Sequence, residues 1–240
     1  MGKPGVSVII PVYNESKGIG ALFEALKPLE SRCEIIFVDG GSSDGTAKHL
    51  EEKGGVVIHS PKGRANQMNR GAFEASGDIL WFLHADSIPP SNAISQIYDV
   101  LGKGYRIGCF PLRFSSNHPF MFIHALMSNQ RVRVLNIAFG DQGIFLQKSL
   151  FKELGGFAPI PLMEDYKLSM DARKAGHKIG MAAGTIVTSA RRYQANGRLK
   201  TMWQMQVLQH RFRRGDDIEE IAHAYNNMKG AGKNVNGRSN

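Results

Sequence analysis

The sequence predicts an α/β protein with a mostly parallel, Rossmann-like sheet that is flanked by helices and followed by C-terminal helices. Residues 6–12 (VSVIIPV) are a continuous apolar, largely β-branched run, which is typical of a strand buried on both faces. A strand-like run followed by a stretch of helical spacing occurs four times in the first hundred residues. The 240 residues are enough for one large domain with a sizeable core.

The four strand and helix pairs follow one another in order. Ile19, Leu22 and Leu26 take positions i, i+3 and i+7 of one helical face. Asp44 and Ser91 are candidate N-caps of the second and fourth helices. The predicted strands are 6–12, 34–38, 56–59 and 79–83, and the predicted helices are 19–26, 44–53, 65–76 and 91–101.

The regular alternation weakens after residue 103. Apolar runs interrupted by glycine alternate there with longer stretches of helical spacing. We expect strands over 105–114, 143–146 and 179–187, and helices over 120–135, 165–175, 199–214 and 218–228.

Composition excludes several classes of protein. Hydrophobic residues make up 42% and charged residues 21%, which is ordinary for a globular chain and unlike a disordered or fibrous one. The longest apolar runs, such as 79–83, are far shorter than the roughly 18 residues of a membrane-spanning helix. The sequence starts without a signal-peptide core, so we expect a cytoplasmic protein. Cys33 and Cys109 form no CxxC pair, which argues against a disulfide framework or a thiolate zinc site.

The chain is basic, with a formal net charge of +9 at pH 7. Residues 187–240 contain ten Lys or Arg and four Asp or Glu, so +6 of this charge lies in the last part of the sequence. A nucleic acid, an acidic membrane surface or a phosphorylated small molecule would each complement such a charge. A solvated basic tail explains it equally well.

A Gly-rich turn follows the second predicted strand. The sequence contains no P-loop, and no GxGxxG opens the first helix, so residues 38–46 (VDGGSSDGT) are a different kind of turn. Its glycines allow a ligand to approach the backbone, and Asp39 can accept hydrogen bonds from a base or ribose. A tight turn with Asp44 as a helix cap explains the same residues without a ligand.

A second polar segment follows the fourth predicted strand, where His84 and Asp86 lie two residues apart in ILWFLHADS. Alternate side chains of an extended segment share a side, so both could face one cation. A carboxylate suits Mg²⁺ or Mn²⁺, and an imidazole favours Mn²⁺. Ligands of parallel sheets bind beyond the carboxyl ends of the strands, so we expect Asp39 and Asp86 to face one crevice.

Together these segments resemble the nucleotide-sugar-dependent glycosyltransferases of family two, whose fold is called GT-A. SVIIPVYNE is similar to the family's first strand and donor-site turn, VDGGSSDGT is similar to its second, and HADS stands where the family has its D-x-D metal motif. Residues 139–145 (FGDQGIF) are similar to the acceptor-side motif, and residues 163–169 (MEDYKLS) to the catalytic-base motif. GRANQMNRGA and SARRY also resemble a bacterial subgroup associated with arsenosugar or radical-SAM gene neighbourhoods.

The resemblance implies an inverting, metal-assisted transfer of a sugar from a UDP- or GDP-sugar to an acceptor hydroxyl. It implies that Mg²⁺ or Mn²⁺ is bound by Asp86 and His84, although His84 stands where the family usually has a carboxylate. The chain also lacks the QxxRW motif of processive synthases, so we expect no polymerisation. The implied nucleotide-sugar-binding residues are Pro11, Tyr13, Glu15, Asp39, Arg64, Asp86, Asp141, Gln142 and Arg192.

Glu164 and Asp165 are the catalytic residues that the resemblance implies, with Asp165 as the general base. Its carboxylate would take the acceptor's proton while the oxygen attacks the anomeric carbon opposite the leaving diphosphate. Both carboxylates also lie at the start of a predicted helix, where the helix dipole favours negative charge without any catalytic role.

The resemblance covers residues 6 to about 190, and we expect one GT-A domain over residues 1–229. The tail over 230–240 is rich in Gly and Asn, and we expect it to be disordered. Within the domain we expect a nucleotide-binding half (1–102), an acceptor and catalytic half (103–190), and a basic helical part (191–229).

A nucleotidyltransferase and a nucleic-acid-binding module are the two alternative functions. A metal-dependent nucleotidyltransferase would use a similar core, but it needs a Lys- or Arg-containing Gly-rich loop after the first strand, and VYNESKGIG fits this poorly. A basic nucleic-acid-binding module lacks support from any helix-turn-helix, RNP or zinc pattern, so we expect no nucleic-acid partner.

The predicted C-terminal helix has a broad apolar face beside Arg211, Arg213 and Arg214. The face consists of Leu199, Met202, Trp203, Met205, Leu208 and Phe212. Core packing explains that face, and peripheral contact with the inner face of a membrane is the alternative.

Overall fold

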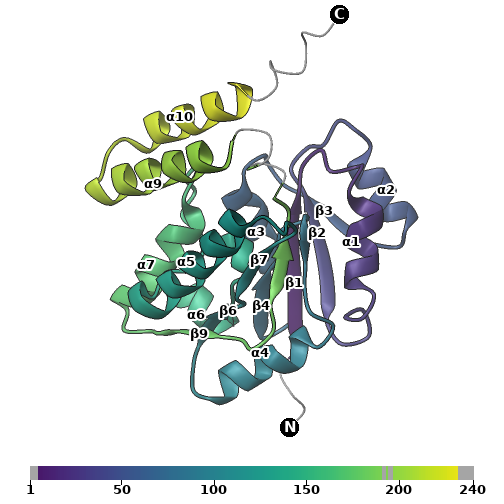
Figure 1. Ribbon diagram of the computed structural model, residues 1–240. Coiled ribbons are helices and arrows are strands. Elements are labelled where there is room, and N and C mark those ends of the chain that lie inside the picture. The colour runs from purple at the N-terminus through teal and green to yellow at the C-terminus, as the bar shows by residue number, and fades with distance from the viewer. Residues whose placement is uncertain (1–4, 191–192, 194–196, 232–240) are drawn as a thin grey trace, which may run out of the picture.

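The computed structural model describes residues 5–190, 193 and 197–231. A seven-stranded sheet forms its centre (Figure 1). Its strands, in the order in which they pair, are β3 (Val56–His59), β2 (Glu34–Asp39), β1 (Val6–Val12), β4 (Ile79–Phe82), β8 (Phe145–Gln147), β6 (Ile107–Cys109) and β9 (Ile179–Met181). The first four are parallel, and β8 runs antiparallel to both of its neighbours. This arrangement confirms the predicted mostly parallel sheet.

Helices cover both faces of the sheet, and each face has its own apolar core. Alternate residues of β1 divide between the cores, with Val8 and Ile10 in one and Ile9 in the other. The first core includes α1 (Ile19–Leu26), α2 (Thr46–Glu52) and α4 (Ala93–Gly102). The second includes α3 (Arg64–Glu74), α5 (Pro119–Leu135), α6 (Lys148–Glu153) and α7 (Glu164–Lys174). Both faces are therefore buried, as the apolar strand runs predict.

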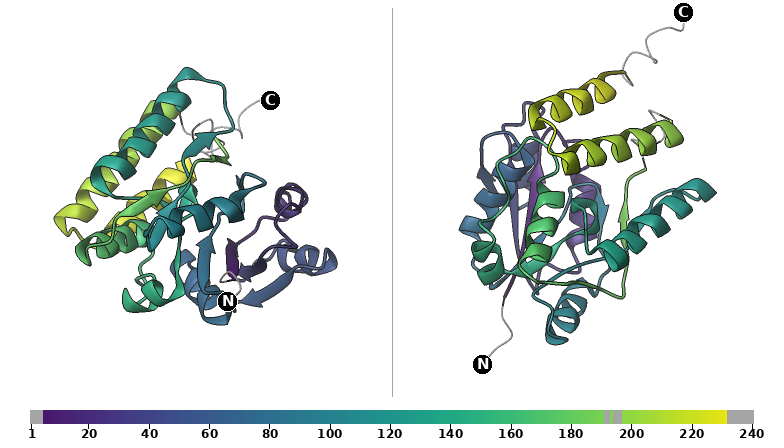
Figure 2. Two further views of the ribbon diagram at one scale, coloured as in Figure 1. Left: turned by 90° about the horizontal axis from the view of Figure 1, so that it is seen from below. Right: turned by 90° about the vertical axis from the view of Figure 1, so that its left-hand side faces the viewer.

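A second sheet and two C-terminal helices complete the described fold. The sheet pairs β5 (Ser87–Ile88), β10 (Ile186–Thr188) and β7 (Leu112–Phe114). Figures 1 and 2 show α9 (Arg198–Arg214) lying between α10 (Ile218–Ala231) and α5. Leu208 of α9, Ile221 and Tyr225 of α10, and Tyr166 of α7 share a third apolar cluster, which attaches the helical pair to the rest of the molecule.

The structure corrects several expected elements. The strand expected over 105–114 is β6 and β7, which belong to different sheets, and the strand expected over 179–187 is likewise β9 and β10. The N-caps of α2 and α4 are Gly45 and Asn92, each one residue after the predicted Asp44 and Ser91. Gly45 has a φ of 85°, a left-handed conformation that glycine adopts readily. Residues 232–240, most of the predicted tail, lie outside the described residues.

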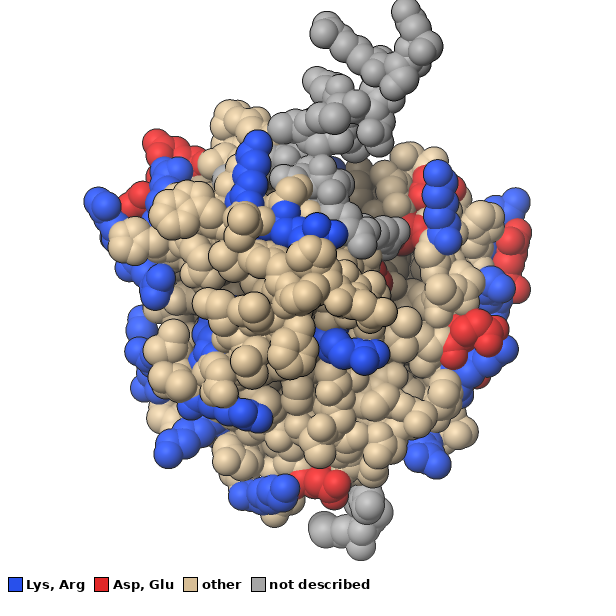
Figure 3. Space-filling view, viewed as in Figure 1, with Lys and Arg blue, Asp and Glu red and all other residues tan. Residues whose placement is uncertain are grey.

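One face of the molecule carries few acidic groups. In Figure 3, Lys and Arg surround a broad tan area, and Asp and Glu lie mostly toward the edges of the view. No described helix has the length and apolar character needed to cross a membrane.

Candidate active site

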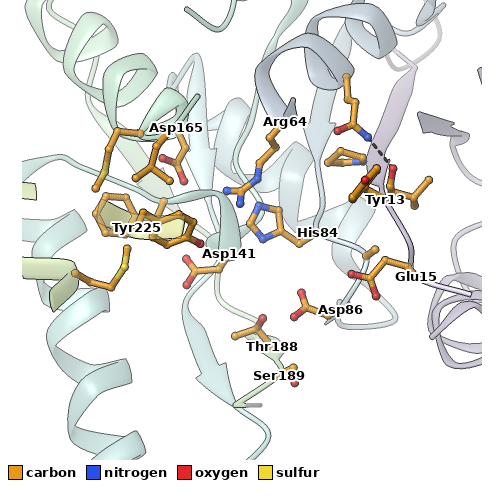
Figure 4. Close-up of a pocket in the computed structure, with 18 of the residues that line it drawn as sticks. Tyr13, Glu15, Arg64, His84, Asp86, Asp141, Asp165, Thr188, Ser189 and Tyr225 are labelled. Carbon is orange, nitrogen blue, oxygen red and sulfur yellow. Dashed lines mark hydrogen bonds between the residues drawn. The ribbon is translucent and has the colours of Figure 1, made fainter. Parts of the chain in front are cut away.

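A pocket of about 510 Å³ opens beyond the carboxyl ends of β1 and β4, where the sheet topology predicts a ligand site. The turn after β1, the start of α3, the segment after β4 and the start of α7 form its walls (Figure 4). The predicted residues that it brings together are Pro11, Tyr13, Glu15, Arg64, His84, Asp86, Asp141 and Asp165. Predicted residues that do not line it are Asp39, Glu164 and Gln142. Arg192 lies outside the described residues.

The turns after β1 and β2 are joined by hydrogen bonds. Asn14 N–H donates to Ser42 Oγ at 2.9 Å, and Ser43 N–H donates to Asn14 Oδ1 at 2.9 Å. Ser16 N–H donates to Asp44 Oδ2 at 3.0 Å. Asn14 has a φ of 54°, which an asparagine tolerates better than most residues. These bonds hold the VYNES turn in the position from which Tyr13 and Glu15 reach the pocket.

Asp39 stabilises its own turn. Its carboxylate accepts N–H bonds from Gly41 and Ser42, each at 3.0 Å, and the Ser42 hydroxyl also donates to it. The side chain is 2% exposed. In this structure the residue therefore acts as a turn anchor, and its predicted contact with a base or ribose stays a prediction.

Gln67, on α3, is a site residue that sequence reasoning missed. Its buried amide donates to the carbonyl oxygens of Val12 at 2.8 Å and Val38 at 2.7 Å, so it joins the carboxyl ends of β1 and β2 beside the pocket. Nothing in its spacing distinguishes it from an ordinary helical glutamine, because its role depends on which two carbonyls the fold brings together.

An ion pair joins the starts of α3 and α7. Arg64 Nη1 lies 3.2 Å from Glu164 Oε1, and the Glu164 side chain is 2% exposed. Burial raises the pKa of Glu164 from 4.5 to about 7, with Arg64 opposing the rise and Asp165 adding to it. Glu164 therefore orients Arg64 from behind the pocket wall, and Arg64 itself faces the cavity (Figure 4).

Glu164 makes stability depend on pH. Between pH 4.5 and about 7 the unfolded chain releases a proton that the folded protein retains, so the wild-type free energy of unfolding should fall as pH rises through this window. The fall should be on the order of 2–3 kcal/mol. Glu164→Gln should remove this slope, which urea unfolding at pH 5 and pH 8 would measure. Equal pH dependence in the two proteins would refute the raised pKa.

Asp165 is held at the start of α7, half-buried, by two backbone groups. Its Oδ2 accepts from Gly140 N–H at 2.6 Å, and its Oδ1 accepts from Tyr166 N–H at 2.7 Å. His84 lies against the same glycine, since a Cβ built on Gly140 would come 2.6 Å from His84 Nε2 and 3.1 Å from Asp165 Oδ2. Gly140 thus allows three segments to meet at one side of the pocket.

Asp141 and Gln142 are neighbours with different surroundings. Asp141 lines the pocket, whereas Gln142 is fully buried beneath it. Gln142 Oε1 accepts from Arg131 Nη2 at 2.9 Å and from Phe139 N–H at 3.2 Å. Arg131 also lies over the Phe139 ring, 3.6 Å from its centroid. Gln142 therefore supports the pocket wall from within, and its predicted sugar contact stays a prediction.

Asp86 is the residue best placed to bind a metal ion. It is exposed, follows β4 and points into the pocket (Figure 4). Among the described residues no cluster of three or more His, Cys, Asp or Glu could hold an ion by itself. One carboxylate fits Mg²⁺ all the same, because Mg²⁺ in phosphate-transfer sites is usually held by one or two carboxylates together with substrate phosphates. His84 also lines the pocket, but its Nε2 is buried beside Gly140, and its predicted part in binding the ion stays a prediction.

The C-terminal helices also reach the pocket. Met205 of α9 and Tyr225 of α10 line it, together with Phe139, Thr188 and Ser189. Met205 and Tyr225 were not predicted as site residues, because an apolar helix face carries no signal that distinguishes a pocket wall from a core.

Comparison with known proteins places the chain in a family. The sequence profile described as "Glycosyl transferase family 2" matches residues 7–156. An undecaprenyl-phosphate 4-deoxy-4-formamido-L-arabinose transferase of Proteus mirabilis is 30% identical over 155 residues, which are 59% of this chain and 48% of the relative. A protein of the same description from Serratia proteamaculans is 38% identical over 114 residues, 42% of this chain and 35% of the relative. The match thus spans about half or less of these relatives.

Solved structures have the same fold. The mannosyltransferase PcManGT of Pyrobaculum calidifontis, in complex with GDP-Man and Mn²⁺, has a TM-score of 0.62 at 19% identity and covers 97% of this chain and 72% of its own. Glucosyl-3-phosphoglycerate synthase of Mycobacterium tuberculosis, in complex with Mn²⁺, UDP-Glc and phosphoglyceric acid, has a TM-score of 0.65 at 20% identity. The match covers 90% of this chain and 81% of the synthase chain. The predicted GT-A fold is confirmed, and with the profile covering more than half of its length the chain belongs to glycosyl transferase family 2.

Proposed function

We propose that this protein transfers a sugar from a nucleoside diphosphate sugar to an acceptor hydroxyl, with inversion at the anomeric carbon. The observation that carries the proposal is that one pocket gathers Arg64, Asp86 and Asp165, which come from three separate segments of the chain. A cation, an exposed carboxylate and a fixed carboxylate are the groups needed to bind a diphosphate, hold a divalent ion and accept a proton.

The donor would lie along the edge formed by β1 and α3. Tyr13 is 39% exposed, and its ring faces Lys62, whose Nζ is 4.2 Å from the ring centroid. A nucleoside can pack against this ring while Arg64 faces the diphosphate, to which a guanidinium donates two parallel hydrogen bonds. UDP-Glc and GDP-Man in the neighbouring structures are consistent with such a donor.

A divalent ion, when bound, would neutralise the charge that develops on the departing diphosphate. Asp86 would hold it, together with the donor's phosphate oxygens.

Asp165 would act as the general base. The acceptor oxygen forms a bond to the anomeric carbon as the bond to the diphosphate oxygen breaks, and the acceptor's proton moves to the Asp165 carboxylate. Hydrogen bonds from Gly140 and Tyr166 fix this carboxylate, and each oxygen retains a lone pair for the proton. Attack from the face opposite the leaving group gives inversion.

The relatives' names supply the first acceptors to test. Undecaprenyl phosphate appears in the names of the Proteus and Serratia relatives, and phosphoglyceric acid is bound in one neighbouring structure. Undecaprenyl phosphate would accept a sugar through a phosphate oxygen and phosphoglyceric acid through its hydroxyl, so the pair also tests which kind of oxygen attacks, and the search then extends to other alcohols.

Calorimetric titration with UDP-Glc, UDP-GlcNAc and GDP-Man, with and without Mn²⁺, tests the donor assignment. We expect at least one of these to bind with a stoichiometry of one, and to bind more weakly when Mn²⁺ is left out. Binding of ATP or CTP with no binding of any nucleoside diphosphate sugar would favour a nucleotidyltransferase and overturn the proposal.

A further inference from the structure

Two helices present an apolar surface to the solvent. Nine of the fourteen exposed large apolar side chains among the described residues belong to α5 and α9, and the other five are scattered. We define the docking surface as the seven of these that lie in the first turns of the two helices: Phe122, Ile123, Leu126 and Met127 on α5, and Leu199, Trp203 and Val207 on α9.

The spacing of these residues makes each set a stripe along its helix. Positions 122, 123, 126 and 127 fall on one face of α5, and positions 199, 203 and 207 are four residues apart on α9. Phe122 is 71% exposed, Trp203 69% and Leu199 68%. Such large side chains cost free energy in contact with water, so a contiguous group of them indicates an interaction site.

The two helices that carry the stripes begin beside one another. An open hollow of about 380 Å³ is lined by His118 and Phe120 at the start of α5 and by residues 197–200 at the start of α9. In Figures 1 and 2 the two helices lie as neighbours on the same side of the molecule. Leu199 of the docking surface lines this hollow, which therefore joins the beginnings of the two helices.

The two helices that carry the docking surface contain basic residues and no acidic ones. The sequence contains no Asp or Glu over 100–140 or over 172–215, and these ranges contain the whole of α5 and α9. The two helices carry seven Lys or Arg residues: Arg131, Arg133, Arg198, Lys200, Arg211, Arg213 and Arg214. The tan area ringed by blue in Figure 3 is the face that bears α5.

We propose that this surface docks on an anionic lipid bilayer, with the apolar stripes of α5 and α9 inserted among the acyl chains and the basic side chains at the headgroups. Apolar residues beside cations, without anions, are the combination that binds a membrane interface. A second copy of the chain fits poorly, because pairing two such surfaces would bring exposed basic side chains such as Arg133 and Lys200 of both copies together.

The docking surface shares only Leu199 and Trp203 with the predicted apolar face of the C-terminal helix. Leu208 of that face is 1% exposed and packs with Met205 and Phe212 against α7 and α10. Arg211 is paired with Asp216 and Glu220, each at 2.9 Å. Leu199 and Trp203 of the predicted face, together with Val207 and the stripe of α5, remain exposed and available for lipid.

The pocket and the docking surface share a wall. Phe114, which lines the pocket, lies 5.2 Å from the ring of His124 on α5 and 5.3 Å from that of Tyr193, which also lines it. Given the proposed function, a lipid-linked acceptor could reach the pocket from the bilayer without leaving it. The docking itself does not depend on the reaction.

Co-sedimentation of the full chain with vesicles tests the docking. We expect binding to vesicles of equal parts phosphatidylglycerol and phosphatidylcholine, weaker binding at high salt, and little binding to phosphatidylcholine alone. Phe122→Glu should weaken binding to the anionic vesicles roughly tenfold or more, because it removes an inserted ring and adds a repelled charge. Phe73→Glu is the matched control, since Phe73 is 77% exposed on α3, outside the docking surface.

Retention of the protein in the supernatant with anionic vesicles at low salt would overturn the proposal, and so would equal loss of binding in both variants. Self-association that Phe122→Glu abolishes, without vesicle binding, would identify the surface as a dimer interface instead. Melting curves of both variants check that each is folded. No nucleotide sugar is present in these vesicle assays. A lack of vesicle binding would therefore overturn the docking proposal without bearing on donor binding or on the proposed sugar transfer.

Discussion

Asp165→Asn should reduce the turnover of sugar transfer by ~10²- to 10⁴-fold, the range that a positioned general base typically contributes. The amide cannot accept the acceptor's proton, whereas Arg64 and Asp86, the groups proposed to bind the donor, remain in the pocket. Donor affinity should therefore stay close to that of the wild type. A transfer assay combined with calorimetric titration of the donor measures both quantities.

The structure adds a cost in stability to this substitution. Both Asp165 oxygens accept a backbone N–H, and an asparagine has only one oxygen, so one donor loses its partner. We expect a loss of about 1–3 kcal/mol in the free energy of unfolding. Turnover must therefore be compared at a temperature where both proteins are folded.

Glu164→Gln is the matched control for Asp165→Asn. It makes the same carboxyl-to-amide replacement at the adjacent position, but Glu164 is buried behind Arg64, so this substitution should cost less turnover. Near wild-type turnover in Asp165→Asn would contradict its role as base. That result would favour an acceptor phosphate, which is already deprotonated at neutral pH and needs no base.

Asp86→Ala should remove most of the dependence of donor binding on a divalent ion, and should lower turnover roughly a hundredfold or more. Asp86 is exposed in the pocket, and a buried carboxylate such as Glu164 cannot take its place. Titration of the donor with and without Mn²⁺ in both proteins measures the dependence.

His84→Ala is the comparison for the metal site. It should affect the ion dependence less than Asp86→Ala does, because His84 Nε2 is packed against Gly140. Its main effect should be on the position of the segment around Gly140, whose N–H donates to the Asp165 carboxylate. Nucleotide binding that is independent of metal in the wild type and unchanged in Asp86→Ala would show that the metal assignment is wrong.

Local patterns predicted the regular first half of the fold. Apolar runs at β1 and β4 indicated buried strands, and parallel strands place their carboxyl ends together, so Asp39 and Asp86 were expected to face one crevice; Asp86 lines the pocket and Asp39 does not. Tyr13 and Arg64 were expected there only from the family resemblance, and both line the pocket. The second half was predicted less well. Short strands such as β6 and β7 differ only in which sheet they join, and pairing over long sequence separations leaves no local pattern.

Side-chain roles were the hardest to predict. Asp39 and Gln142 have residue types suited to binding, but the structure uses their oxygens for a turn and for Arg131. Gln67 and Tyr225 have ordinary helical positions, and only the tertiary arrangement brings them to the pocket. Hydrogen-bond partners are set by the fold as a whole, so residue type limits the possible roles without selecting one.

The stereochemistry of transfer to a simple alcohol tests the central claim most directly. Methanol can serve as a surrogate acceptor hydroxyl, and a methyl glycoside keeps the anomeric configuration in which it forms. The donor is α-linked, as in UDP-Glc or GDP-Man, whichever the protein binds. We expect the wild type to form a methyl β-glycoside, identified by proton NMR, and Asp165→Asn to lose this product. A methyl α-glycoside would contradict direct displacement with Asp165 as the base.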